Sequence, residues 1–110
     1  MTLHDRFFIV RSHSVDLNVL SPLSEATELK LMMKKVKQLK TMASKYGYRA
    51  VFIDEGAHIG KYTILLSQLI NKVIVLEQDP RNFVLLKYNI KLNNIPNVIV
   101  LTLVAISQYL

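Results

Sequence analysis

Apolar residues in the second half of the chain fall in three short runs, separated by longer mixed segments. The runs are AVFI at 50–53, KVIVLE at 72–77 and NVIVLTLVAI at 97–106. Short continuous apolar runs are typical of strands buried on both faces, as in a parallel sheet. We therefore predict three parallel strands, and we expect the first of them to be covered on both faces.

The segments between these runs have the length and composition of helices. They are KYTILLSQLI at 61–70 and DPRNFVLLKYNIKLNN at 79–94. Asp79 is placed to cap the second helix, Pro80 suits its first position, and Asn93-Asn94 closes it. Residues 50–110 thus predict β-α-β-α-β, a partial doubly wound parallel sheet of the Rossmann-like α/β class.

The first half of the chain predicts an extension of short strands and one amphipathic helix, within a single domain of residues 1–110. RFFIVRSHSVDLNVL, at 6–20, favours one or two short strands. SPLSEATELK, at 21–30, reads as a helix start, with Ser21 or Ser24 as the cap. The predicted apolar stripe of this helix is Leu29, Met32, Met33, Val36, Leu39 and Ala43. Gly47 ends the helix, so the extension covers 1–49.

Composition excludes several classes of protein. A chain of 110 residues that is 51% hydrophobic can bury a core and forms one domain at most. It has no cysteine, which excludes disulfides and thiolate metal sites and favours a cytoplasmic location. The N-terminus lacks a signal-peptide pattern, and no apolar run reaches the roughly 20 residues that span a bilayer.

The net charge of +6 lies mainly in the first half of the chain. Residues 1–50 hold nine of the fourteen Lys and Arg against four acids, whereas residues 51–110 hold five against four. The lysines at 30, 34, 35, 37 and 40 suit a solvated helix face, and they leave nucleic-acid binding open as an alternative.

The chemically distinctive stretch is VFIDEGAHIG, residues 51–60. In doubly wound sheets, ligands bind beyond the carboxyl ends of the strands, which is where Asp54 and Glu77 follow their apolar runs. Gly56 and Gly60 allow a tight turn and a close approach of the backbone to a ligand. A carboxylate such as that of Glu77 can accept hydrogen bonds from both hydroxyls of a ribose.

The spacing disfavours a nicotinamide dinucleotide as the ligand. The fingerprint G-x-G-x-x-G would require glycine where the chain has His58 and Lys61. Asp54 and Glu55 would also repel a pyrophosphate at the turn. An acidic turn suits a ligand with a cationic end, and S-adenosylmethionine, with its ammonium and sulfonium groups, meets that requirement.

Residues 51–107 resemble the front of a class I S-adenosylmethionine-dependent methyltransferase. In particular they resemble the FkbM-like group, with its D-x-G-A-N-x-G turn, its E-P-x-P after the second strand and a helix ending N-x-x-x-N. The resemblance implies that the methionine part of the cofactor is held at the turn and the ribose by the second acid. The residues that it assigns to the cofactor are Asp54, Gly56, Ala57, His58, Gly60, Thr63, Glu77 and Gln78.

Within that resemblance, Thr63 is expected to reach the cofactor carboxylate, and Gln78, with Asp79, to border the adenine. His58 stands where the group usually has Asn, and Gln78 where it usually has Pro. A lone histidine offers too few ligands for a metal, so we expect no metal site and a hydrogen-bonding role for His58. Glu55 reads as a solvated acid.

The sequence therefore predicts transfer of a methyl group from S-adenosylmethionine to an acceptor that the sequence does not identify. Members of the family continue into further strands that carry substrate-facing groups, so no catalytic residue is assigned here. The alternatives are a non-catalytic methyltransferase-like subunit and a basic nucleic-acid-binding module. Because open apolar strand edges recruit other strands, we expect self-association or a partner chain.

Overall fold

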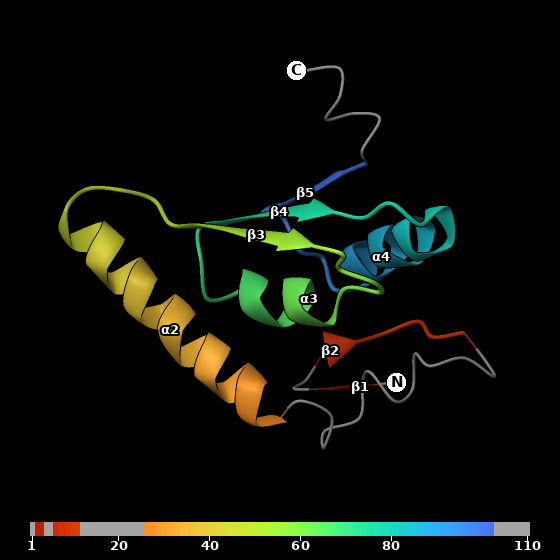
Figure 1. The fold of residues 1–110 in the computed structure, drawn as a ribbon, viewed down its shortest axis with the longest axis horizontal. Coiled ribbons are helices and arrows are strands. Elements are labelled where there is room, and N and C mark those ends of the chain that lie inside the picture. The colour runs from red at the N-terminus through yellow and green to blue at the C-terminus, as the bar shows by residue number, and fades with distance from the viewer. Residues whose placement is uncertain (1, 4–5, 12–25, 103–110) are drawn as a thin grey trace.

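The computed structural model describes residues 2–3, 6–11 and 26–102, and its centre is a parallel three-stranded sheet (Figure 1). The strands are β3 (Val51–Glu55), β4 (Lys72–Leu76) and β5 (Val98–Leu101), in the order β3-β4-β5. Helices α3 (Lys61–Ser67) and α4 (Pro80–Leu92) connect them. The predicted β-α-β-α-β order and the α/β class are confirmed.

Three further elements precede the sheet. Strands β1 (Thr2–Leu3) and β2 (Arg6–Phe7) form a two-stranded antiparallel ladder, and helix α2 (Ala26–Lys45) follows. The predicted helix caps Ser21 and Ser24 lie outside the described residues, as do positions 12–20 and 103–110. No helix in the described part of the chain is long and apolar enough to cross a membrane.

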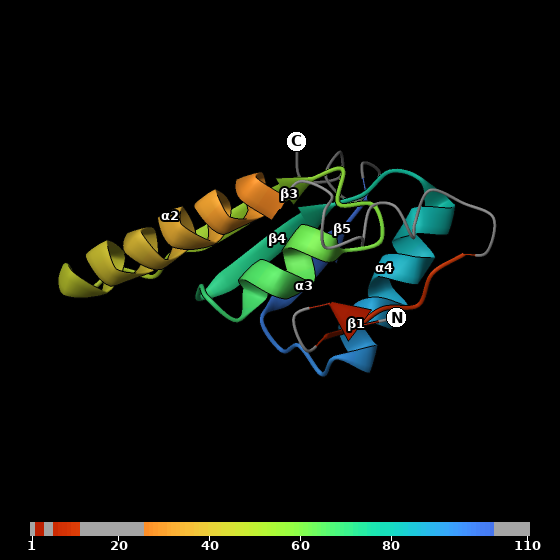
Figure 2. The same ribbon diagram turned by 90° about the horizontal axis from the view of Figure 1, so that it is seen from below.

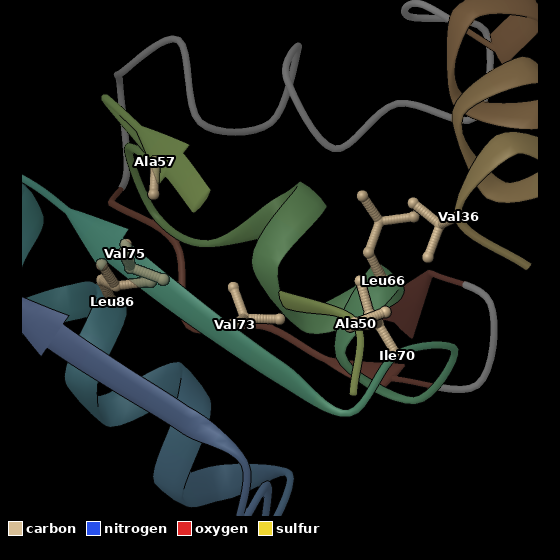
Figure 3. Close-up of a cluster of buried hydrophobic side chains, with 8 residues drawn as sticks. All are labelled: Val36, Ala50, Ala57, Leu66, Ile70, Val73, Val75 and Leu86. Atoms are coloured by element: carbon tan, nitrogen blue, oxygen red, sulfur yellow. The ribbon is translucent and has the colours of Figure 1, made fainter. Parts of the chain in front are cut away.

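The sheet holds its core on one face only. Right-handed crossovers that advance in one direction along a sheet place their helices on the same face. Val73 and Val75 of β4 point to that face, where they pack with Leu66 of α3 and Leu86 of α4. Figure 3 shows this cluster, with Val75 and Leu86 gathered at one end of it.

The prediction that the first strand is buried on both faces is wrong. In β3, Val51 is 45% exposed and Ile53 is 63% exposed, whereas Phe52 between them is partly buried and packs against the core. Helix α3 lies on one side of the sheet, and no helix among the described residues covers the other side (Figure 1). The same open face includes Ile99 of β5. An open apolar face is consistent with the predicted self-association, which stays a prediction.

Helix α2 packs against the core along one stripe that runs from Leu29 to Ala43. Leu29 and Val36 are buried, and Val36 meets Leu66 and Ala50 at the other end of the cluster (Figure 3). Leu39, predicted to belong to the apolar stripe, is 48% exposed. The helix extends past the end of the sheet (Figure 2), and in its last turns Ala43 is partly buried against the core cluster. Its lysine face is solvent-exposed, and the nucleic-acid alternative stays a prediction.

The ends of the helices follow their local chemistry. Gly47 follows α2 with φ of 78°, and its N–H donates to the Ser44 carbonyl at 3.1 Å. Asp79 caps α4 by accepting from the Arg81 N–H at 2.9 Å, and Pro80 takes the first position, as predicted. Helix α3 ends at Ser67, three residues before the predicted end. The Leu69 N–H there donates to the Leu66 carbonyl at 2.9 Å, which closes a tight turn.

Candidate cofactor site

The two acids predicted from the sequence meet at one edge of the sheet. Asp54 is the fourth residue of β3, and Glu77 follows the last residue of β4. The parallel register pairs Glu55 with Leu76, and the Gly56 N–H donates to the Leu76 carbonyl at 2.7 Å. The carboxyl ends of both strands therefore lie together, which is where ligands bind in sheets of this class.

The two glycines of the turn, Gly56 and Gly60, have different surroundings. Gly56 has φ of 70°, and a Cβ built on it would meet no atom within 4 Å. Gly60 has φ of 99°, and a Cβ there would lie 2.6 Å from Leu86 Cδ1. Gly56 thus leaves open space in front of the turn, whereas Gly60 lets α3 begin in close contact with α4.

His58 occupies the third unusual position of the turn. Its φ of 57° is in the left-handed region, where Asn, Asp and His are the side chains most often tolerated. This gives a physical reason why His can stand where the FkbM-like pattern has Asn. The sequence analysis named His58 for its hydrogen bonding and gave no signal of its backbone conformation.

Asp54 is a half-buried carboxylate with a dedicated donor. The hydroxyl of Thr63, which is itself fully buried, donates to Asp54 Oδ2 at 2.8 Å. Burial raises the pKa of Asp54 above its ordinary value; the Thr63 hydrogen bond opposes the shift, and the nearby Glu77 charge adds to it. The geometry gives Thr63 the task of orienting this carboxylate, and its contact with a cofactor carboxylate stays a prediction.

Asp54→Asn is expected to stabilise the fold near neutral pH and to flatten its pH dependence. Because its folded pKa is raised, Asp54 contributes stability that is complete below its unfolded pKa, near 3.8, and is lost as the pH rises through the folded pKa. Asn keeps an oxygen that can accept from Thr63 but has no charge to bury. Urea unfolding from about pH 4 to about pH 7.5 measures the difference.

Asp79→Asn serves as the control of opposite sign. Its backbone and side-chain hydrogen bonds with Arg81 lower the pKa of Asp79, so its contribution is present at neutral pH and is lost as the pH falls. Parallel stability profiles for Asp54→Asn and the wild-type chain would contradict the role given to burial.

Glu77 lies deeper than Asp54 and has an amide beside it. Its side chain is buried, with 6% exposure, and Asn82 Nδ2 donates to Glu77 Oε1 at 3.1 Å. The Oδ1 atom of Asn82 is buried and has no hydrogen-bond partner among the described residues. A buried carboxylate beside an unpaired amide oxygen suits a ligand that brings donors, as the two hydroxyls of a ribose do. These residues fit the ribose of S-adenosylmethionine.

The remaining predicted residues surround these two acids. Ala57 is buried and packs with the core cluster, so its contribution at the turn comes through the backbone. Gln78 is exposed just beyond Glu77, and Glu55 is exposed on the opposite side of β3 from Asp54. No group of three or more His, Cys, Asp or Glu side chains that could hold a metal comes together in residues 2–3, 6–11 and 26–102.

A cavity of about 560 Å³ lies away from these acids, between α4 and β5. Side chains of α4 line it together with Val98 and Val100. It contains neither acid and no residue of the glycine turn. We place the candidate site at the turn because the carboxylates, the left-handed backbone and the unpaired amide oxygen all lie there.

Sequence analysis missed three residues that the fold brings to this region. Asn89, which is fully buried, joins the turn to the N-terminal segment: its Nδ2 donates to the Ile59 carbonyl at 2.9 Å. Asn93 contacts the same segment one helical turn later. Arg11 places Nη2 at 3.3 Å from His58 Nε2. The N-x-x-x-N spacing was visible in the sequence, but its partners are about 80 residues distant along the chain.

A parallel Rossmann-like sheet with an acid and a glycine turn after one strand and a second acid after the next fits the class of S-adenosylmethionine-dependent methyltransferase domains. The family model of the TRM5/TYW2 methyltransferase domain matches residues 25–108, and the chain belongs to this family. Its function is therefore S-adenosylmethionine-dependent methyl transfer. No curated protein matches the chain. The finer likeness to the FkbM-like group is not confirmed by this match.

Proposed function

We propose that this chain binds S-adenosylmethionine across the carboxyl ends of β3 and β4, as the cofactor for methyl transfer. The observation that carries the proposal is the pair of carboxylates at one sheet edge, Asp54 held by Thr63 and Glu77 buried beside Asn82. The family match supports the class of reaction.

Each acid has a distinct task in this proposal. Glu77 accepts hydrogen bonds from the ribose hydroxyls, and Asn82 fixes the orientation of its carboxylate through Oε1. Asp54 faces the ammonium end of the cofactor, where its negative charge is stabilised by a cation. Gly56 keeps the backbone clear of side-chain atoms where the ligand approaches.

The bound cofactor supplies a methyl group on a sulfonium, which a nucleophile of the acceptor displaces. The protein contributes mainly alignment to such a displacement. The described residues hold the cofactor and leave the acceptor unidentified. The finer assignment to the FkbM-like group stays a prediction, as do the non-catalytic and nucleic-acid-binding alternatives.

Calorimetry with S-adenosylmethionine, S-adenosylhomocysteine and NAD tests the proposal. The wild-type chain is expected to bind the first two and not NAD. Glu77→Gln is expected to weaken binding by about 1.5–3 kcal/mol, roughly 10- to 150-fold, as for hydrogen bonds to a charged group. The change keeps the oxygen that accepts from Asn82 and removes the charge.

The matched control is Glu55→Gln, which neutralises an exposed acid directly before Gly56 of the same turn. Its affinity for S-adenosylhomocysteine is expected to match that of the wild-type chain. Binding of NAD without binding of S-adenosylmethionine would refute the proposal. Equal losses in the two glutamate variants would refute the role given to Glu77.

A further inference from the structure

The segment of residues 6–11 is held along α4 by two asparagine side chains. Asn93 Oδ1 accepts from the Phe7 N–H at 2.8 Å, and Asn93 Nδ2 donates to the Phe7 carbonyl at 2.7 Å. One helical turn earlier, Asn89 makes the same pair of bonds with Ile9, at 2.6 and 3.2 Å. The two amides pair with alternate residues of the segment as a neighbouring strand would, and Figure 2 shows β2 and its continuation beside α4.

This pairing places residues 9–11 of the segment beside the glycine turn. Ile9 and Ile59 share the amide of Asn89, so the segment is tied directly to the glycine turn. Two residues beyond Ile9, Arg11 Nη2 lies 3.3 Å from His58 Nε2. A guanidinium has only donors, so a hydrogen bond in this contact runs from Arg11 to His58 Nε2.

The position of Arg11 matters because the charged side chains already placed at the site are acids. Asp54 and Glu77 suit the ammonium and the ribose, but S-adenosylmethionine also carries a carboxylate at its methionine end. Thr63, predicted to meet that carboxylate, donates its one hydroxyl proton to Asp54 in this structure. Lys61, the other cation next to the turn, holds its ammonium 5.8 Å from the centre of the Tyr62 ring.

We propose that Arg11 is a specificity-determining residue of the cofactor site, whose guanidinium binds the carboxylate of S-adenosylmethionine beside His58. The proposal rests on the proposed function and names the partner of one group of the cofactor. A planar guanidinium matches a carboxylate with two parallel hydrogen bonds. Asn89 and Asn93 act as positioning residues for it by holding the backbone of residues 7 and 9.

The test compares S-adenosylmethionine with decarboxylated S-adenosylmethionine, which keeps the ammonium and the sulfonium. The wild-type chain is expected to prefer the carboxylated ligand. Arg11→Gln is expected to weaken the binding of S-adenosylmethionine about 10- to 100-fold and to leave the affinity for the decarboxylated ligand unchanged. Arg11→Lys keeps the charge without the planar pair of donors. Its affinity for S-adenosylmethionine is expected to lie between those of the wild-type chain and Arg11→Gln.

Arg6→Gln is the matched control. Arg6 lies on the same segment, but its Nη2 donates to Gln68 Oε1 at 2.7 Å, away from the glycine turn. The control is expected to keep the wild-type affinity for both ligands, and the thermal midpoints of both variants show whether they fold.

Any of four results would overturn the proposal. Arg11→Gln weakening both ligands equally, or leaving the preference for the carboxylated ligand intact, would remove Arg11 from the site. If the wild-type chain binds both ligands equally, and binding is sensitive to Glu77→Gln, only the role of Arg11 fails. If the wild-type chain binds neither ligand, the proposed function fails and the role of Arg11 fails with it.

Discussion

Gly60→Ala is expected to lower the free energy of unfolding by about 2–5 kcal/mol. Two costs combine at this position. A residue with a Cβ held at φ of 99° is strained, which costs about 1–2 kcal/mol in the left-handed region. The added Cβ would also lie 2.6 Å from Leu86 Cδ1 and 3.3 Å from Ile64 Cδ1. Both side chains are fully buried, so they must repack to admit the Cβ, and overpacking costs about 1–3 kcal/mol.

Gly56→Ala is the matched control, four residues earlier in the same turn. Its φ of 70° carries the strain, but no atom lies within 4 Å of the added Cβ, so the loss of stability is expected to stay near 1–2 kcal/mol. Its effect is expected on ligand affinity, because the new methyl group enters the space where the cofactor approaches. Urea unfolding and calorimetry on both variants separate the two roles. Equal losses of stability would contradict the close approach of Leu86 to Gly60.

Asn89→Ala is expected to lower the free energy of unfolding by about 2–5 kcal/mol. The Asn89 amide is fully buried and makes three hydrogen bonds, two to Ile9 and one to the carbonyl of Ile59. Removing it leaves the Ile9 N–H and the buried Ile59 carbonyl without this partner. A buried group that loses its partner costs about 1–3 kcal/mol. The volume of the missing amide adds the cost of a cavity.

Asn93→Ala provides the comparison on the same helix. Its two bonds to Phe7 are exposed, so water can replace the amide, and the expected loss is about 0.5–1.5 kcal/mol. Denaturant unfolding measures both variants. Limited proteolysis is expected to cut the segment of residues 6–11 much faster in Asn89→Ala. If Asn93→Ala lost as much free energy of unfolding as Asn89→Ala, burial would not decide how strongly these asparagines hold residues 7 and 9.

Sequence patterns predicted the elements that depend on neighbouring residues. Asp79 and Pro80 start α4 as expected, because a cap and a first-turn proline act within one helical turn. Gly47 follows the end of α2 because glycine readily adopts the left-handed conformation that ends a helix, which is also a local effect. The two mistaken predictions concern burial. An apolar run suggested a strand covered on both faces, yet Ile53 is exposed because both crossover helices lie on the other face of the sheet. Leu39 has helical spacing but is 48% exposed, whereas Ala43, one helical turn further along α2, packs against the core.

The sequence alone also predicted that Asp54, the glycine turn and Glu77 lie together, because the carboxyl ends of parallel strands lie at the same edge of the sheet. That inference needs only strand order and the positions of the acids along the strands. The tertiary structure decided the rest. Only the fold shows that the Thr63 hydroxyl donates to Asp54, that Asn82 donates to Glu77 and that Arg11 lies beside His58.

The physical reason for this division is the range of the interactions. Caps, turns and apolar periodicity act over a few residues, and the sequence displays them directly. Asn89 instead meets Ile9 across 80 positions, and Arg11 meets His58 across 47. Such contacts have no period and no fixed spacing. They exist because α4 packs against the glycine turn and presents a row of amide groups with which the N-terminal segment pairs.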